Sequence, residues 1–209
     1  MALKAAIWDL EGVLLKPIRG NFSSMLGERL GVTEEQVKRI LHSPQNALWD
    51  LGEMTDDEFY AFILETLALP AEKKAAIESF VIDDFRVDPV LLDYIRALRS
   101  RITTALLTNF PAHVHDHFKK AWFIDGAFDH IIASCDVKLL KPDPRMYELA
   151  LQRTGCRPEE AVFIDDRMVN VDGARALGCM PCFMKPANKP CPRWMLCLIN
   201  NLLSLKGRG

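Results

Sequence analysis

The chain has 209 residues, with 26 lysine and arginine residues against 28 aspartate and glutamate residues, so its formal net charge is −2. Hydrophobic residues make up 49% and charged residues 26%, a balance typical of globular proteins that excludes extended disorder. The near-zero net charge argues against nucleic-acid binding, and no apolar run of about 18 residues predicts a transmembrane helix. The length allows one domain, or one domain with a sizeable insertion.

The first predicted element is a short apolar stretch over residues 3–8, in which Lys4 is the only charge. A run of this length followed by turn residues is typical of a strand buried on both faces, although a buried helix can show the same pattern. The short length and the following Gly12 favour the strand.

Helical patterns occupy the next block, between about residues 20 and 85. Residues 33–36 and 55–58 each have the capping-box pattern of a threonine followed three positions later by glutamine or glutamate. Pro70 ends the second of these helices, and another is predicted over residues 71–80. No strand is expected in this block. Three carboxylates near its end are expected to be solvated linker residues: Asp83, Asp84 and Asp88.

From residue 88 onward, strand-like and helical patterns alternate, which predicts a parallel sheet covered by helices on both faces. Strands are predicted over residues 103–107, 131–133, 161–164 and near 182. Helices are predicted over residues 88–99, 111–120, 144–153 and 194–205, and a further helix follows the strand over 161–164 and ends at 177. The predicted fold class is therefore α/β, with a doubly wound, Rossmann-like parallel sheet interrupted by a helical insertion after its first strand.

Six cysteines raise the question of a zinc site. Cys179 and Cys182 have a suitable spacing, but the next pair, Cys191 and Cys197, is six positions apart and enters an apolar segment. The start of the chain lacks a signal-peptide pattern, so free, reduced thiols and a cytoplasmic location are expected.

Three histidines alternate after the second core strand: His113, His115 and His117. His113 and His117 share a helix face and could bind a metal, but such residues more often line a helix near a pocket mouth. Trp49 and Trp122 could contact a substrate, but aromatic residues in such places are more often packing residues.

Polar residues follow four of the predicted core strands or lie in the next loop. They are Asp9, Glu11 and Gly12 after the first strand, Thr108 and Asn109 after the second, Lys141 in the loop after the third, and Asp165 and Asp166 after the fourth. In open α/β sheets, ligands bind beyond the carboxyl ends of the strands, so these groups are expected to converge.

Converging carboxylates of this kind suit phosphoryl transfer. Several carboxylates at one site repel each other, and a cation such as Mg²⁺ relieves that repulsion while binding phosphate oxygens. One carboxylate can act as nucleophile and a second as acid and base, while a lysine and a hydroxyl stabilise the transferred group.

The ordered set Asp9-x-Glu11-Gly12-Val13, Thr108-Asn109, Lys141-Pro142 and Asp165-Asp166, with Asn170, Gly173 and Ala174, resembles the haloacid dehalogenase-like hydrolases. The resemblance covers nearly the whole chain. It implies a catalytic core over residues 1–16 and 87–209. It also implies a helical cap over residues 17–86, similar to that of sugar-phosphate phosphatases, 2-haloacid dehalogenases and the phosphatase domain of epoxide hydrolases.

The resemblance also implies roles for the polar residues. Asp9 would be the nucleophile and a metal ligand, and Glu11 would supply a backbone carbonyl to the metal and stand at the acid/base position. Thr108 and Asn109 would contact the phosphoryl group, and Lys141 would neutralise it. The implied cofactor is Mg²⁺, and its ligands would be Asp9, Glu11, Asp165 and Asp166, with Asp166 the more direct of the acidic pair.

One position departs from the family pattern, because phosphatases of the family usually have aspartate where this chain has Glu11. Glutamate has the same acid group on a stem one methylene longer. Three hypotheses follow: a Mg²⁺-dependent phosphatase of a small phosphorylated metabolite, a catalytically weak binding or regulatory protein, and a 2-haloacid dehalogenase. The third fits less well, because cation-free dehalogenases commonly have tyrosine at this position and lack the acidic pair.

Overall fold

The computed structural model describes residues 2–184. Its centre is a five-stranded parallel sheet in the order β5-β4-β1-β6-β7. The strands are β1 (Ala5–Trp8), β4 (Thr103–Thr108), β5 (His130–Ala133), β6 (Ala161–Asp165) and β7 (Met180–Phe183). The predicted α/β core with its parallel sheet is confirmed, and β1, whose side chains are all buried, lies in the middle of it.

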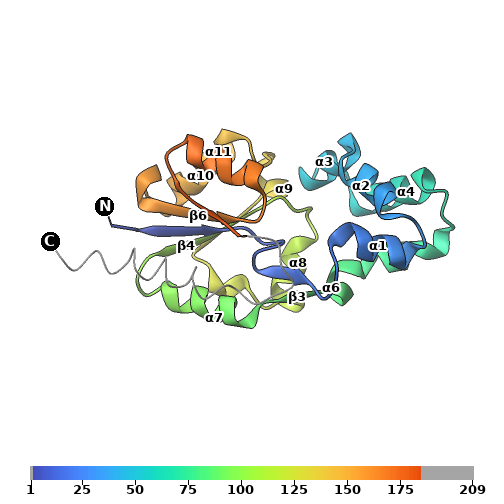
Figure 1. Ribbon diagram of the computed structural model, residues 1–209, viewed down its shortest axis with the longest axis horizontal. Coiled ribbons are helices and arrows are strands. Elements are labelled where there is room, and N and C mark those ends of the chain that lie inside the picture. The colour runs from blue at the N-terminus through green and yellow to red at the C-terminus, as the bar shows by residue number, and fades with distance from the viewer. Residues whose placement is uncertain (1, 185–209) are drawn as a thin grey trace.

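Helices cover both faces of this sheet (Figure 1). On one face lie α10 (Pro144–Thr154) and α11 (Met168–Ala176), and on the other lies α7 (Pro89–Leu98). Alternate residues of β1 enter separate cores: Ala5 and Ile7 pack with α10, whereas Ala6 and Trp8 join the larger core cluster. This two-residue alternation is the physical basis of the doubly wound arrangement.

The remaining core helices are short. They are α8 (Val114–Lys120), α9 (Ser134–Val137), η2 (Asp125–Ala127) and η3 (Pro158–Glu160). The helix predicted over residues 111–120 begins three residues later than expected, at Val114. Residues 111–113 instead lead into the helix through a turn, in which Val114 N–H donates to Pro111 O at 3.1 Å. The helix predicted over residues 194–205 lies outside the described residues.

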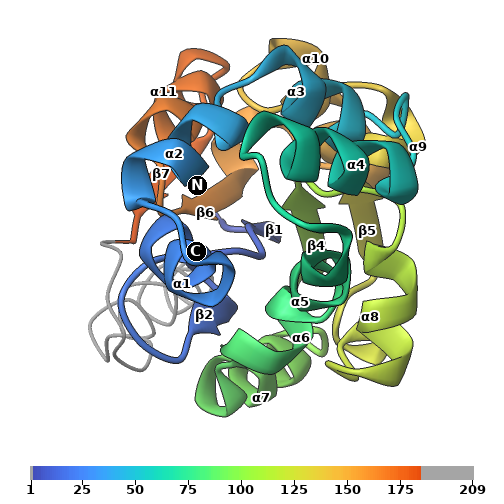
Figure 2. The same cartoon turned by 90° about the vertical axis from the view of Figure 1, so that its right-hand side faces the viewer.

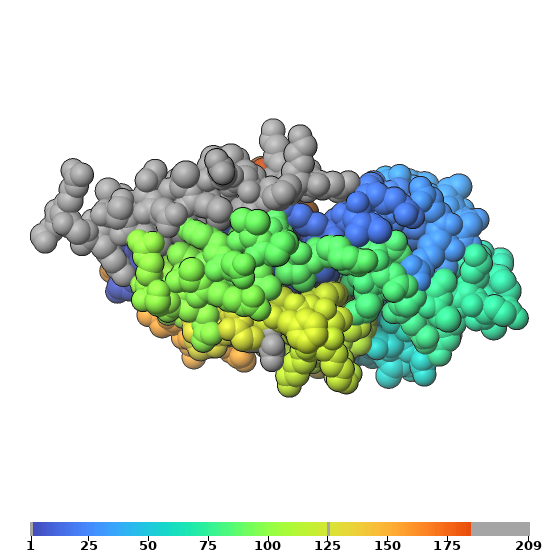
Figure 3. Space-filling view, turned by 90° about the horizontal axis from the view of Figure 1, so that it is seen from below, coloured from blue at the N-terminus to red at the C-terminus, as the bar shows by residue number. Residues whose placement is uncertain are grey.

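A helical segment is inserted in the sequence between β1 and β4 and forms one end of the molecule (Figures 1 and 3). It consists of α1 (Phe22–Leu30), α2 (Glu34–Leu41), α3 (Pro44–Asp50), α4 (Asp56–Thr66), η1 (Ala71–Lys73), α5 (Lys74–Glu78) and α6 (Phe80–Asp84). Both predicted capping boxes are present, at Thr33 and Thr55. The single helix predicted over residues 71–80 is instead divided into η1, α5 and the start of α6.

A pair of short antiparallel strands joins this segment to the core. β2 (Leu15–Pro17) pairs with β3 (Phe85–Val87), and Asp88 N–H extends the pairing by donating to Leu14 O at 2.9 Å. Neither strand is predicted from the sequence, because three residues are too few to show alternation. The predicted boundaries at 16/17 and 86/87 fall inside this pair, and the division into core and cap domains stays a prediction.

The expectation that Asp83, Asp84 and Asp88 are solvated linker residues is wrong for two of them. Asp84 is buried and accepts a bond of 2.5 Å from Arg29 of α1. Asp88 is also buried, and its carboxylate caps α7 and pairs with Lys16 at 3.3 Å. Asp88 joins the two connections between core and helical segment through Lys16, whereas Asp84 joins α6 to α1 within the helical segment.

No helix in residues 2–184 is both long enough and apolar enough to cross a membrane.

Candidate active site

Asp9 follows β1 at the centre of the sheet and is nearly buried. Its backbone N–H donates to Ile164 O at 2.9 Å, which continues the pairing of β1 with β6. Asp9 Oδ1 accepts from the N–H of Leu10 and from Lys141 Nζ, both at 2.7 Å. These bonds fix the orientation of the carboxylate at the carboxyl edge of the sheet.

Lys141 bridges two carboxylates. Its Nζ donates to Asp9 Oδ1 at 2.7 Å and to Asp165 Oδ2 at 2.8 Å, with only 2% of its side chain exposed. Asn109 holds the backbone of Lys141 from both sides: Oδ1 accepts from Lys141 N at 2.8 Å, and Nδ2 donates to Lys141 O at 3.0 Å. Lys141 is therefore a positioned buried cation, and the Asn109 side chain is engaged in placing it.

The acidic pair divides into one anchoring and one cavity-lining residue. Asp165 is fully buried and, besides Lys141, accepts from Arg167 N–H at 2.8 Å and from Asn170 Nδ2. Asp166 instead lines the cavity. Both lie within 4.8 Å of Asp9, measured between carboxylate oxygens. The structure thus brings together the three aspartates that the sequence analysis placed at the metal site.

Gly12 makes room for Asp166. Its φ is +79°, and a Cβ at this position would overlap the carboxylate of Asp166. The turn after β1 can therefore lie against the acidic pair only because residue 12 has no side chain.

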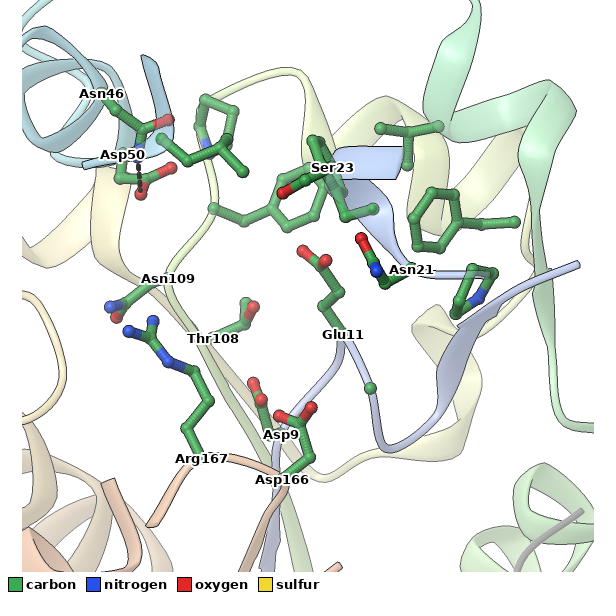
Figure 4. A pocket seen from close by; sticks show the side chains of 18 of the residues that line it. Asp9, Glu11, Asn21, Ser23, Asn46, Asp50, Thr108, Asn109, Asp166 and Arg167 are labelled. Carbon is green, nitrogen blue, oxygen red and sulfur yellow. Dashed lines mark hydrogen bonds between the residues drawn. The ribbon is translucent and has the colours of Figure 1, made fainter. Parts of the chain in front are cut away.

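Glu11 and Thr108 complete the set (Figure 4). Thr108 is buried at the end of β4 and lines the cavity. The Glu11 side chain points away from Asp9 toward Ser23 of the helical segment. Within residues 2–184, its carboxylate forms no hydrogen bond with another side chain or with the backbone. Glu11 is therefore free to exchange a proton with a molecule in the cavity.

The electrostatics of this cluster reflect four carboxylates around one buried lysine. Burial raises the pKa of Asp9 to about 7, the Lys141 charge opposes the rise, and Asp165 adds to it. Burial also raises the pKa of Glu11 to about 7, helped by Asp9, and that of Asp166 to about 7, helped by Asp165 and Glu11. Burial alone would lower the pKa of Lys141, but Asp9 and Asp165 raise it above its ordinary value.

A divalent cation fits this donor set. Hard cations such as Mg²⁺ take oxygen ligands and relieve the mutual repulsion that, after burial, adds to these raised pKa values. The floor also holds an orphaned acceptor, because Asn170 Oδ1 is buried and has no hydrogen-bond partner among the described residues. Water molecules carried by such an ion would supply the missing donor. Asp9, Asp166 and the Glu11 backbone carbonyl are the candidate ligands, and Asp165 supports them through Lys141 and Asn170.

These residues form the floor of a cavity of about 950 Å³ that reaches into the helical segment. Four charged residues of its lining were not predicted: Lys16 of β2, Lys38 of α2, Asp50 of α3, and Arg167, whose guanidinium extends toward Asn109 in Figure 4. Burial raises the pKa of Asp50 to about 7. Arg167 directly follows the acidic pair and could have been found from that position, whereas no local pattern marks Asp50.

The three histidines after β4 have separate surroundings. His113 Nδ1 lies 3.0 Å from Asp56 Oδ1 of the helical segment, so it joins the two parts of the chain. His117 lies inward against Trp122, with ring centroids 5.1 Å apart. His115 Nε2 lies 3.0 Å from Asp136 Oδ1, and these two side chains form with Cys135 a second group that could hold a metal ion.

The cysteine pair with zinc-like spacing belongs to no candidate metal group in the part of the chain that the structure describes. Cys179 and Cys182 are buried free thiols. Their predicted partners Cys191 and Cys197 lie outside that part.

A comparison with known families matches residues 3–178 to the haloacid dehalogenase-like hydrolases. The chain belongs to this family. The resemblance inferred from the four motifs is thereby confirmed.

Curated relatives include phosphatases. A sesquiterpene phosphatase of Aspergillus oryzae is 26% identical over 176 residues, covering 84% of this chain and 86% of that protein. Bifunctional epoxide hydrolase 2 of Sus scrofa is 27% identical over 208 residues, covering 85% of this chain and 36% of that protein, so this family member spans about a third of the epoxide hydrolase. 2-Haloacid dehalogenases are also among the relatives.

Solved structures show the same fold. A haloacid dehalogenase family enzyme of Bacteroides thetaiotaomicron, crystallised as a magnesium complex, superimposes with a TM-score of 0.75 at 22% identity, covering 90% of this chain and 96% of that one.

Proposed function

We propose that this hydrolase is a Mg²⁺-dependent phosphatase that cleaves a small phosphorylated metabolite through an aspartyl-phosphate on Asp9. The observation that carries the proposal is the convergence of Asp9, Lys141 and Asp166 on the floor of one cavity. A cation-free reaction on a haloacid would need one carboxylate as general base to activate water, whereas two further carboxylates, Glu11 and Asp166, line the cavity beside Asp9. The phosphatase relatives support the same conclusion.

Each step of this reaction can be assigned to residues of the cavity floor. The Asp9 carboxylate, oriented by Leu10 N–H and Lys141 Nζ, attacks phosphorus while the ester P–O bond breaks, and the leaving oxygen takes the proton of Glu11. The Glu11 carboxylate then takes a proton from water, which attacks the aspartyl-phosphate and releases inorganic phosphate and Asp9. Lys141 and Thr108 stabilise negative charge on the phosphoryl oxygens. Bound Mg²⁺ would neutralise charge on the carboxylates and the phosphoryl group.

The deciding experiment is phosphate release from a panel of metabolite phosphates, with Mg²⁺ or with excess chelator. We expect release to require Mg²⁺ and to fall at least about a thousandfold in Asp9→Asn, because no other group replaces the nucleophile. Asp172→Asn, an exposed carboxylate of α11 paired with Arg175, is the matched control and should retain wild-type activity. Halide release from a 2-haloacid without Mg²⁺, or a folded wild type silent across the panel, would overturn the proposal.

Glu11→Asp separates an efficient enzyme from a catalytically weak binding protein. We expect kcat/KM to fall about a hundredfold, because the carboxylate would sit about 1 Å short of the leaving oxygen that this pocket positions for glutamate. Steady-state kinetics on the best panel substrate measures this. A large gain in rate would show instead that Glu11 impairs the site.

A further inference from the structure

The cavity above the catalytic floor has a different chemical character from the floor itself. Its side toward the helical segment is formed largely by apolar side chains from α1, α2, α6, β3 and the loop after β4: Phe22, Leu41, Val81, Phe85 and Phe110. A phosphoryl group on the floor would direct the organic part of its ester toward these residues.

This apolar side is a packed wall. Phe22 lies 5.1 Å from Phe80 and 5.7 Å from Phe85, measured between ring centroids, and Phe80 and Phe85 are themselves 5.7 Å apart. Phe22, Leu41 and Val81 pack against the main core and are only partly buried there. The part that the core leaves uncovered is apolar surface open to a ligand, and such surface gains free energy when a ligand removes it from water.

The polar side chains above the floor are mostly engaged with the protein. Asn21 caps α1 through Ser24 N–H, and Asn46 Nδ2 donates to Asp50 at 3.0 Å. His113 is bound to Asp56. A site that recognises sugar hydroxyls needs polar groups whose bonds are completed by the substrate. Here Asn21, Asn46 and His113 already have partners, as do Lys16 with Asp88 and Lys38 with Glu34. Of the remaining lining groups on this side, Ser23 and His42 have no side-chain hydrogen bond among the described residues.

We infer that the side of the cavity toward the helical segment binds an apolar organic group, so that the substrate is the phosphate monoester of a hydrophobic alcohol. This inference rests on the proposed phosphatase activity. The cavity volume of about 950 Å³ accommodates an organic group of drug-like size in addition to the phosphoryl group.

The test is a chain-length series of n-alkyl phosphates with two, four, six and eight carbons, with sorbitol 6-phosphate as a polar comparator. We expect kcat/KM to rise about threefold to fourfold per methylene until the cavity is filled, and to exceed that for sorbitol 6-phosphate. The Kd values of the matching alkylphosphonates, measured with Mg²⁺ present, should show the same slope without turnover.

Substitution within the wall locates the effect. Leu41→Gln and Val81→Asn should flatten the chain-length dependence. Leu48→Gln, at a residue of α3 that is 38% exposed and outside the cavity lining, should keep the wild-type slope. Thermal melting of each variant checks folding.

The outcomes separate this inference from the phosphatase proposal. A flat series, or preference for sorbitol 6-phosphate, with Mg²⁺-dependent and Asp9-dependent phosphate release intact, overturns the apolar subsite alone. A slope that persists in Leu41→Gln and Val81→Asn also overturns it. Loss of phosphate release and phosphonate binding for every ligand overturns both.

Discussion

Gly12 is the residue on which the geometry of the acidic floor depends most directly. A side chain there would meet two obstacles: the positive φ of +79°, and the carboxylate of Asp166. Gly31 has nearly the same φ, +81°, but a Cβ there would meet no atom within 4 Å. Alanine substitution at Gly31 would therefore introduce backbone strain alone, whereas substitution at Gly12 would introduce backbone strain and also displace Asp166.

We predict that Gly12→Ala weakens Mg²⁺ binding at least tenfold and lowers the free energy of unfolding by about 1–2 kcal/mol, because alanine is strained at positive φ and pushes Asp166 away. Calorimetric titration with Mg²⁺ and thermal unfolding measure the two effects. Gly31→Ala is expected to lose comparable stability and to bind Mg²⁺ like the wild type. Equal Mg²⁺ affinity in both variants would show that Asp166 does not depend on Gly12.

The residues of the floor also show what a sequence can say about a site. Asp9, Lys141, Asp165 and Asp166 could be expected to meet because each follows a parallel strand or lies in the next loop, and parallel strands end at one edge. The division of labour between Asp165 and Asp166 could not, because it depends on which carboxylate turns toward Lys141. The engagement of the Asn109 side chain with the Lys141 backbone is a contact 32 residues apart that no local pattern encodes.

At the scale of elements, helix α8 carries a pH-sensitive residue away from the floor. Burial, aided by the charge of His113, lowers the pKa of His117 to about 4, and its Nδ1 has no hydrogen-bond partner among the described residues. In the unfolded chain this histidine titrates near pH 6.5. The folded state therefore binds fewer protons between pH 6.5 and pH 4, and the free energy of unfolding falls as the pH is lowered through this window.

We predict that His117→Phe removes part of this acid sensitivity. Because the ring is only about half-buried, screening by water limits the difference from wild type to about 1 kcal/mol at pH 5. Urea unfolding at several pH values measures it. Above pH 7.5, where histidine is neutral in both states, the difference between the two proteins should be independent of pH. A constant difference down to pH 5 would contradict the assignment.

The sequence predicted the elements that are long, or whose defining residues lie close together in the chain. Strands β4 and β6, each five or more residues of apolar character, were expected, and so were the helices whose capping residues lie within three positions of each other. The pair β2 and β3 was missed because its register joins residues about 70 positions apart. The Arg29–Asp84 ion pair was missed for the same reason, since its partners are 55 positions apart.

For the whole molecule, two contacts besides the His113–Asp56 contact fix the arrangement of the helical segment over the sheet. One is the strand pair β2–β3, and the other is a contact between helix α9 of the core and the loop after α3 (Figure 2). In this contact Ser134 Oγ donates to Asp50 O at 2.5 Å, and Lys138 Nζ donates to Leu51 O at 2.7 Å and Gly52 O at 2.9 Å. The acceptors in this second contact are all backbone carbonyls of the helical segment. Its strength therefore depends on the two donor side chains of the core, Ser134 and Lys138.

We predict that Lys138→Met loosens this contact locally. Loss of the two bonds from an exposed side chain should cost about 1 kcal/mol, which corresponds to about fivefold faster hydrogen exchange at the amides of residues 51–53. Lys120→Met, which removes an exposed lysine paired only with Asp116 on its own helix, is the matched control and should leave exchange at 51–53 unchanged. Native-state exchange followed by mass spectrometry measures both. Uniform acceleration across the chain would mean that Lys138 supports global stability, and unchanged exchange at 51–53 would mean that Ser134 and the strand pair suffice to hold the segment in place.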